Sequence, residues 1–155
     1  MIIRHLYISE GHNFFGHHGR PPGEHPSVEV PEIECVAARG IRGDRFFDFK
    51  RNYKGQITFF AIEDYEAICN VLGVCNKTPA VFRRNVITQS LELQRLLGME
   101  FEIQGVRFRG TEECAPCYWL NAAFAPGSEQ FLKGRGGLRA VILTSGALRI
   151  GDERH

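Results

Sequence analysis

The stretch that decides the fold class is Met99-Glu100-Phe101-Glu102-Ile103-Gln104-Gly105-Val106-Arg107-Phe108-Arg109. Apolar and polar residues alternate along both arms of this stretch, which is typical of strands that bury one face. Gly105 permits the tight turn that joins two such strands. The stretch therefore predicts an antiparallel hairpin in a β-rich protein.

Strand patterns continue on both sides of this hairpin. Further strands are predicted at residues 1–9, 28–38 with a break at Pro31, 56–62, 86–88, 140–143 and 147–150. One short helix follows residue 62, directs Cys69 towards the core and ends at Gly73. A second, capped by Ser90, is expected to bury three leucines and to end at Gly98; the leucines are Leu93, Leu96 and Leu97.

About seven strands and three short helices predict a mostly β fold with short helices (α+β), closed as a β-barrel. The length of 155 residues suits a single domain over residues 1–155. The net charge of +1 gives no bulk field that would attract nucleic acid or an anionic membrane. No apolar run is long enough to span a membrane and no secretion signal is recognisable, so a cytoplasmic protein is expected.

The most reactive candidate is the segment Cys114-Ala115-Pro116-Cys117. Proline is favoured at the first helical position, which predicts a helix over residues 116–123 with Cys117 in its first turn. There the positive end of the helix dipole favours a thiolate, the form of cysteine that attacks sulfur and binds soft metals. Cys117 is thus the predicted reactive sulfur, and Cys114 is an accessory.

Other interpretations of this cysteine pair stay open. A dithiol redox pair of the thioredoxin type would follow an early strand, whereas this pair comes late in the chain. Zinc would need two further ligands, and no second Cys-x-x-Cys or paired-histidine motif is present. Four histidines, His12, His17, His18 and His25, lie in a loop rich in glycine and proline without regular ligand spacing. We interpret them as polar surface residues rather than metal ligands.

Arginines cluster in three further segments, near predicted strand ends at 40–45 and 83–85 and around glycines at 133–139. Guanidinium groups bind phosphate or carboxylate with two hydrogen bonds, and glycine lets backbone N–H groups approach an oxyanion. The candidate anion-binding residues are Arg45, Arg84, Asn85, Arg135, Gly136 and Arg139. The alternative is that some of these arginines form ordinary salt bridges with Asp44, Asp48 or Glu63.

In this order, the motifs resemble the MOSC domain family, found at the C-terminus of molybdenum cofactor sulfurases and as stand-alone bacterial proteins. The resemblance rests on residues 40–46 (GIRGDRF), 56–58 (QIT), 83–86 (RRNV), 97–98 (LG), 113–117 (ECAPC), 135–137 (RGG) and 151–152 (GD). It implies a MOSC-type β-barrel and assigns the characteristic cysteine to Cys117. Many stand-alone members carry an arginine just upstream of the Pro-Cys step, where this chain has Cys114.

The resemblance implies binding of the molybdenum cofactor (molybdopterin), with Cys117 as the metal ligand and the arginines on the phosphate and pterin. The implied reaction is reduction of N-hydroxylated compounds, which needs an electron-transfer partner. A second reading is a sulfur carrier that receives a persulfide on Cys117 from a desulfurase. The desulfurase, not this chain, would hold PLP. A third reading is a non-catalytic barrel with a structural or zinc-bound cysteine pair, so enzyme activity is left open.

Overall fold

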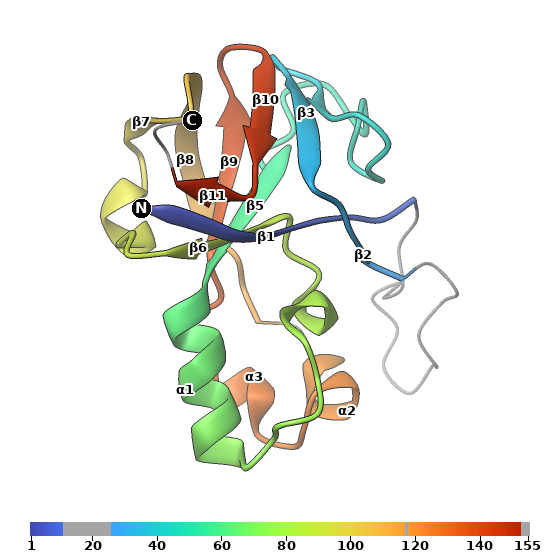
Figure 1. Cartoon of the computed structure of the whole chain (residues 1–155), viewed down its shortest axis with the longest axis vertical. Coiled ribbons are helices and arrows are strands. Elements are labelled where there is room, and N and C mark those ends of the chain that lie inside the picture. The colour runs from blue at the N-terminus through green and yellow to red at the C-terminus, as the bar shows by residue number, and fades with distance from the viewer. Residues whose placement is uncertain (11–25, 117, 153–155) are drawn as a thin grey trace.

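An eight-stranded sheet runs through the centre of the computed structural model, which describes residues 1–10, 26–116 and 118–152 (Figure 1). The strands are β1 (Ile2–Ile8), β2 (Val28–Glu29), β3 (Glu32–Val36), β4 (Gly40–Ile41), β5 (Ile57–Ala61), β6 (Val86–Gln89), β7 (Glu100–Ile103), β8 (Val106–Glu113), β9 (Leu138–Ile142), β10 (Gly146–Arg149) and β11 (Gly151–Asp152). The helices are α1 (Ile62–Leu72), α2 (Leu120–Ala123) and α3 (Ser128–Phe131), with two 3₁₀ helices, η1 (Pro79–Phe82) and η2 (Leu93–Leu96).

The large sheet has the strand order β11-β1-β6-β5-β9-β8-β7, and β2 pairs with β1 beside this path. Only β5 and β6 pair in parallel; the other strand pairs that the structure describes are antiparallel. A second sheet has the order β10-β3-β4. The mostly β, α+β character expected from the sequence is confirmed, as is the hairpin formed by β7 and β8.

The prediction of a closed barrel is wrong, because neither sheet closes in the described part of the chain. The chain leaves the large sheet for the small one between β2 and β3, at Pro31, which has no N–H to continue a ladder. The small sheet then packs beside the large one. Gln104 joins the hairpin turn to β10: its amide donates to the Arg149 carbonyl at 2.9 Å and accepts the Arg149 N–H at 2.8 Å.

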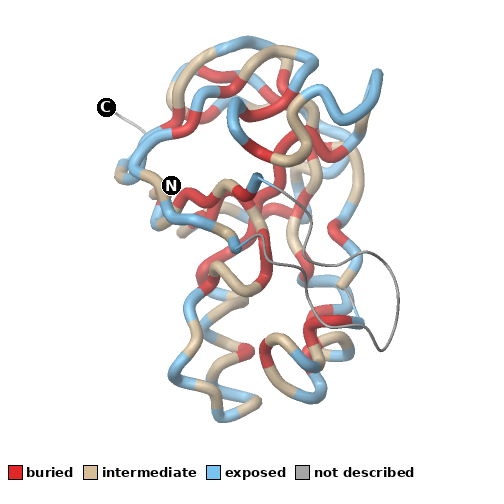
Figure 2. Tube along the Cα trace, turned by 90° about the vertical axis from the view of Figure 1, so that its right-hand side faces the viewer, coloured by how far each residue is buried: buried red, intermediate tan, exposed pale blue. Residues whose placement is uncertain are grey.

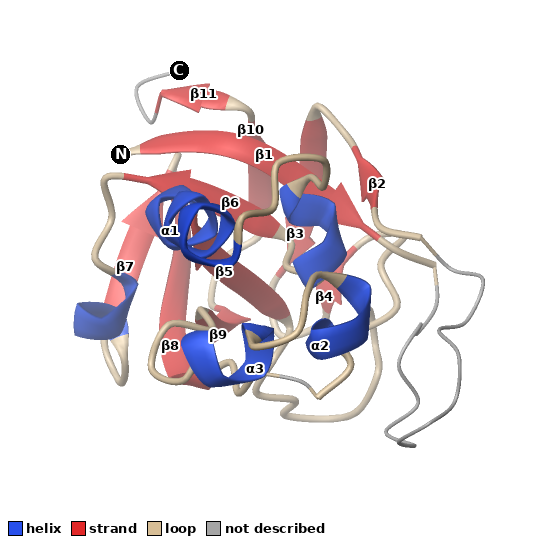
Figure 3. Ribbon diagram, turned by 90° about the horizontal axis from the view of Figure 1, so that it is seen from below, coloured by secondary structure: helices blue, strands red, loops and turns tan. Residues whose placement is uncertain are grey.

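Two hydrophobic cores lie on either side of β5. One, between the two sheets, includes Phe59, Phe108 and Leu148. The other includes Phe60 and Ile68 and lies under the helices, which gather at the lower end of Figure 1 and at the front of Figure 3. Figure 2 shows buried stretches, in red, concentrated on interior strands. Every residue of β5 is buried, because successive side chains of a strand point to opposite faces.

Helix α1 confirms the helix predicted after residue 62. Gly73 ends it in the left-handed conformation, at φ 67°, as the sequence predicts. Cys69 packs against the core under the helices. No helix in the described ranges is long and apolar enough to span a membrane.

The helix predicted after Ser90 is only partly correct. Ser90 has φ 62° and its N–H donates to the Glu63 carboxylate, so it lacks the extended conformation of an N-cap. The 3₁₀ helix η2 follows Glu92 instead, and Leu97 is 51% exposed rather than buried. A close approach limits this segment: a Cβ on Gly110 would lie 2.2 Å from the Leu96 carbonyl oxygen.

The helix predicted over residues 116–123 is also shorter than expected. α2 begins at Leu120, and Pro116 lies outside any regular element. Cys114 instead extends the pairing of β8 with β9, because its N–H donates to the Gly137 carbonyl at 2.8 Å. Pro116 therefore follows the end of a strand and does not start a helix, which removes the argument that a helix dipole activates Cys117.

Candidate anion-binding site

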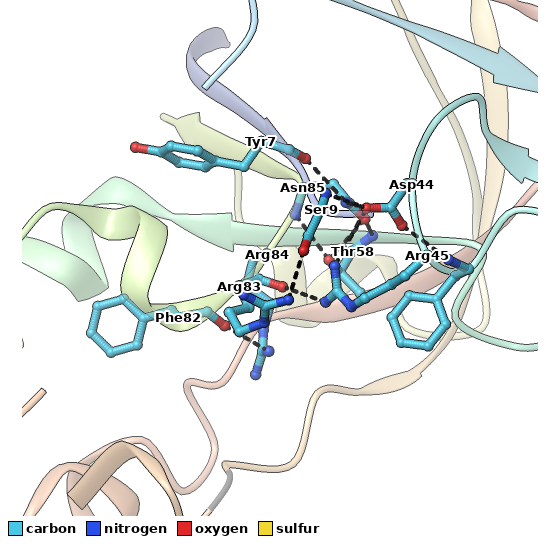
Figure 4. A network of polar contacts seen from close by, with 10 residues as sticks. Tyr7, Ser9, Asp44, Arg45, Thr58, Phe82, Arg83, Arg84 and Asn85 are labelled. Carbon is cyan, nitrogen blue, oxygen red and sulfur yellow. Dashed lines mark hydrogen bonds and ion pairs between the residues drawn. The ribbon is translucent and has the colours of Figure 1, made fainter. Parts of the chain in front are cut away.

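Polar side chains from distant parts of the chain meet between β1, β5 and the start of β6 (Figure 4). Asp44 lies at the centre, with its side chain fully buried. Its Oδ1 accepts hydrogen bonds from the Ser9 N–H at 3.0 Å and from Asn85 Nδ2 at 3.5 Å, and its Oδ2 accepts the Phe46 N–H at 3.3 Å. Arg45 Nη1 donates to Oδ1 at 3.3 Å. Asp44 thus organises the loop that carries Arg45.

Asn85 is the second anchor of the site and is 2% exposed. Its N–H donates to Thr58 Oγ1 and its Oδ1 accepts the Thr58 N–H, both at 3.0 Å. On the other side, its carbonyl accepts the Tyr7 N–H at 2.8 Å and its Nδ2 donates to the Tyr7 carbonyl at 3.2 Å. Asn85, which lies just before β6, therefore links β1 to β5 through hydrogen bonds and fixes the position of the neighbouring arginines.

The side chains of Arg83 and Arg84, the two residues before Asn85, bind different partners. Arg83 has φ 58°, a left-handed conformation that turns the backbone at the end of η1. Its Nη2 donates to Ser9 Oγ at 2.8 Å. Arg84 donates from Nη1 to the Phe82 carbonyl and from Nε to the Gly136 carbonyl, both at 3.0 Å. These two bonds use two of the five N–H groups of its guanidinium.

Arg45 completes the cluster from the loop after β4. Its guanidinium carbon lies 4.6 Å from the centre of the Phe46 ring, and its Nη2 donates to the Arg83 carbonyl at 3.3 Å. Only 9% of the Arg45 side chain is exposed. Asp44, Arg45, Arg83, Arg84 and Asn85 are called the arginine cluster below.

The cluster brings several positive charges close to one carboxylate. The pKa of Arg83 is lowered to about 10, first by burial and then by the charge of Arg45, while Asp44 opposes the shift. Burial also lowers the pKa of Arg45, with Asp44 opposing and Arg84 adding repulsion. Guanidinium groups that repel one another in a poorly solvated place favour a bound anion.

Gly136 connects the cluster to the cysteine segment. Its carbonyl accepts the Arg84 hydrogen bond, and a Cβ at this position would lie 2.0 Å from the Cys114 carbonyl oxygen. Gly137 has φ 105°, and its Cβ would lie 2.2 Å from the Phe59 carbonyl oxygen. Only glycine permits both approaches. The glycine pair predicted as an anion-binding element thus serves here to bring two backbone segments together.

The structure brings together four of the six predicted anion-binding residues: Arg45, Arg84, Asn85 and Gly136. Arg135 is exposed and lies over the Phe131 ring at 4.7 Å. Arg139 pairs with Glu112 at 3.1 Å, the ordinary salt bridge that the sequence left open as an alternative. Similarly, Asp48 pairs with Arg39.

Sequence reasoning missed Ser9, Tyr53 and the side chain of Arg83. Tyr53 lies close enough to Arg139 and Arg45 for their charges to lower its pKa, although burial raises it overall. A usable signal was the run of aromatic and basic residues over 45–54, because such residues stack on one another: the rings of Phe46 and Tyr53 lie 5.2 Å apart. Ser9 carries no comparable sequence signal.

Four of the five cysteines lie in the described residues. Cys114 is 2% exposed. Cys117, predicted as the reactive sulfur and metal ligand, lies outside the described residues, as does the loop with His12, His17, His18 and His25. Within residues 1–10, 26–116 and 118–152, no three histidine, cysteine, aspartate or glutamate side chains are grouped as a metal site.

Solved structures resemble this fold over most of the chain. YuaD from Bacillus subtilis superposes with a TM-score of 0.76 at 19% identity, covering 97% of this chain and 92% of its own. YiiM from Escherichia coli gives 0.62 at 17% identity, covering 97% and 71%. YiiM from Geobacillus stearothermophilus gives 0.65 at 15% identity, covering 99% and 74%. At these identities the likeness establishes the fold alone.

Sequence comparison adds the family. No curated protein matches the chain significantly. The family model of the MOSC domain matches residues 17–154, nearly the whole length, and so agrees with the order of motifs in the sequence. Because this match covers residues 17–154, the chain belongs to the MOSC domain family.

Proposed function

We propose that this MOSC protein binds the molybdenum cofactor, with the arginine cluster holding the phosphate of the cofactor and Cys117 acting as the sulfur that contacts the metal. The observation that carries the proposal is the gathering of arginine side chains around one buried carboxylate, with Arg45 and Arg84 close enough for their charges to interact. A phosphate monoester is largely a dianion at neutral pH, so these guanidinium groups match it in sign.

The donors in the cluster also suit a phosphate group. Arginine presents a planar fork of N–H groups that matches phosphate oxygens, and the remaining N–H groups of Arg84 stand at a partly exposed position. Asn85 and Asp44 hold the arginines through buried hydrogen bonds, so little side-chain entropy is lost when an anion binds. The described residues therefore fit the anionic part of the cofactor.

Sulfur chemistry would come from the neighbouring cysteine segment. Gly136 places Cys114 against the backbone that receives Arg84, so the segment before Cys117 starts beside the cluster. A thiolate is a ligand that suits a soft metal centre. When bound, the cofactor supplies a redox-active metal, and reduction of an N-hydroxylated compound with electrons from a partner protein is the proposed reaction class.

The two alternative functions make no use of the arginine cluster. A sulfur carrier needs an exposed Cys117 and a donor desulfurase, and its release step would draw on Cys114, which is 2% exposed. A structural or zinc-bound cysteine pair needs no anion site at all. Of the three functions, only cofactor binding gives these arginines a ligand, and for that reason we favour the cofactor.

The test is to purify the wild type and three variants, Arg84→Gln, Cys117→Ala and Arg95→Gln, from a host that makes molybdenum cofactor. Molybdenum and pterin are measured on each protein. Losing one charged hydrogen-bond donor costs about 1.5–3 kcal/mol, so Arg84→Gln should retain roughly ten- to hundredfold less cofactor. Arg95 is exposed and pairs with Glu92, so Arg95→Gln is the matched control and should resemble the wild type.

Two results would contradict the proposal: neither molybdenum nor pterin on the wild type, or equal loading of the wild type and Arg84→Gln. If Cys117→Ala holds as much molybdenum as the wild type, only the proposed role of Cys117 as the metal ligand is rejected. Mass spectrometry after incubation with a desulfurase and cysteine tests the carrier reading. An added sulfur on Cys117, together with no cofactor on the wild type, would select that reading instead.

A further inference from the structure

A pocket of about 410 Å³ opens between β1, α1 and η1. Its base is formed by Tyr7, Tyr65, Ile62 and Pro79. Ile62 and Pro79 are buried, and the Tyr7 side chain belongs to the core under the helices. The size falls within the range of small-molecule sites in proteins, and the base offers aromatic and apolar surface. Nothing in the proposed cofactor chemistry uses this pocket.

Hydrogen bonds hold the aromatic base in place. The Tyr65 hydroxyl donates to the Lys77 carbonyl, and the side chain of Tyr7 is hydrogen-bonded to that of Thr78. The His5 ring stacks on the Tyr7 ring, with 5.8 Å between the ring centres and 18° between the planes. The base is therefore preorganised, which reduces the entropy that a ligand must overcome.

Carboxylates dominate the charge around the pocket. Glu29 and Glu66 lie at exposed positions on its rim. His5 Nδ1 lies 2.8 Å from Glu29 Oε2 and orients that carboxylate. Arg4 is the one arginine among the pocket residues, and its Nη1 donates to Gln89 of β6 at 2.8 Å.

The effect of these carboxylates reaches both phenols. The pKa of Tyr7 is raised to about 12, first by burial and then by the charge of Glu29. The pKa of Tyr65 is also raised to about 12, chiefly by burial, then by its hydrogen bond with Cys69, with Glu66 adding to the shift. Each phenol thus lies near a carboxylate from a different element. Glu29 of β2 acts on Tyr7, and Glu66 of α1 acts on Tyr65.

We infer that this pocket is a binding site for a small organic cation, an amine or quaternary ammonium group attached to a compact apolar or aromatic body. The partly exposed Tyr65 ring offers aromatic surface that attracts a cation, and the two glutamates on the rim provide its counter-charges. The apolar body of the ligand would lie against Ile62 and Pro79.

This pocket is separate from the arginine cluster, although the two meet at one residue. Figure 4 shows the Tyr7 ring pointing away from the cluster while its carbonyl faces Asn85. The side chain of Tyr7 therefore lines the cation pocket, and its backbone belongs to the anion site.

The test compares three probes that share one ring and differ in charge: benzylamine, benzyl alcohol and benzoate. Each is titrated into the full chain at pH 7 and followed by isothermal calorimetry and by amide chemical shifts. We expect saturable binding of benzylamine with a dissociation constant on the order of 1 mM, at least about tenfold tighter than benzyl alcohol. Shifts should be largest around Tyr7, Tyr65 and Thr78.

Variants locate the binding. Glu66→Gln and Glu29→Gln keep the shape of the rim and should each weaken benzylamine binding about five- to tenfold. Glu92→Gln removes an equally exposed carboxylate that pairs with Arg95 away from the pocket, and should leave binding unchanged. Circular dichroism and urea unfolding check that each variant is folded.

Equal affinity for benzyl alcohol, tighter binding of benzoate, or no effect of either pocket variant would overturn the inference. So would the absence of saturable benzylamine binding by the wild type. The wild-type probe series needs no variant, so it decides even if a substitution disturbs folding.

Discussion

The arginine cluster and the cysteine segment meet at Gly136, yet they are held in opposite ways. In the cluster, Asp44 and Asn85 are buried, and their side chains bond to backbone groups of three separate segments. In the cysteine segment, Cys114 makes the last bond to β9, and the next regular element starts only at Leu120. The comparison contrasts an anion site held by buried side-chain hydrogen bonds with a cysteine segment whose described start is held by backbone pairing.

The largest effect is expected from Gly136→Ala, because this residue supports both regions. A Cβ would lie 2.0 Å from the Cys114 carbonyl oxygen, a backbone atom that cannot move without breaking the pairing with Gly137. We expect a loss of about 3 kcal/mol or more in the free energy of unfolding, measured with urea.

Gly134→Ala is the control for this substitution. Gly134 has φ 80° but nothing within 4 Å of an added Cβ, so only backbone strain of about 1 kcal/mol is expected. If Gly136→Ala loses no more stability than Gly134→Ala, the close approach to Cys114 does not explain the need for glycine at position 136.

The next largest effect compares a substitution in the arginine cluster with one in α2, the first regular element after the cysteine segment. Asn85→Ala should cost about 2–3 kcal/mol, because it leaves the buried N–H of Thr58 and carbonyl of Tyr7 without their partner. Asn121→Ala, in α2, removes one acceptor of the Glu129 N–H at a half-buried position and should cost about 1 kcal/mol. Urea unfolding measures both, and equal losses would contradict the larger contribution expected from the buried network.

A smaller effect concerns the protection of Cys114. In a Cys117→Ser variant, labelling by iodoacetamide is followed residue by residue with mass spectrometry. Cys75 is exposed and should react first. Cys35 is buried, and burial raises the pKa of its thiol to about 12, so it should react last. Cys114 should react at least about tenfold more slowly than Cys75, since the segment must open before the reagent reaches it. Labelling as fast as Cys75 would show that the segment is open in solution.

The smallest effect concerns the Tyr7 phenol and is seen in the pH dependence of the free energy of unfolding. The pKa of Tyr7 is raised from 10.0 to about 12, first by burial and then by Glu29. Below pH 10 the phenol is protonated in both the folded and the unfolded chain, and its contribution to the free energy of unfolding is fully present. Above pH 10 the unfolded chain releases its proton first, so the free energy of unfolding falls until the folded chain ionises near pH 12.

Tyr7→Phe should therefore flatten the pH dependence between pH 10 and 11 by about 1 kcal/mol, measured by urea unfolding at each pH. Equal slopes for wild type and variant would mean that the Tyr7 phenol is better solvated than its position in the core implies.

Local patterns predicted those elements that local forces determine. The alternation around Gly105 gave the β7–β8 hairpin, and the helical spacing before Gly73 gave α1. The MOSC family was recognisable because its motifs keep their order along the chain. Closure of the sheet was predicted wrongly, because it depends on pairing between strands far apart in sequence and on the break at Pro31.

The candidate site was predictable where a residue type has a strong chemical preference. Arg45 and Arg84 were found because guanidinium groups near predicted strand ends indicate an anion site. Asp44 was considered only as a salt-bridge partner, since nothing in the sequence shows that it also receives the Ser9 N–H across the fold. Pro116 was placed in a helix because local preference cannot register the long-range bond from Cys114 to Gly137.

The positive charge of the arginine cluster also bears on how a ligand arrives. The whole chain carries a formal charge of only +1, so the positive charge of the cluster is a local feature of the molecule. Carboxylates lie around the pocket on the other side of Tyr7. A local positive field attracts an approaching anion towards the cluster. Salt screens this attraction over about 8 Å at physiological ionic strength, so added salt slows the encounter more than it weakens the buried contacts.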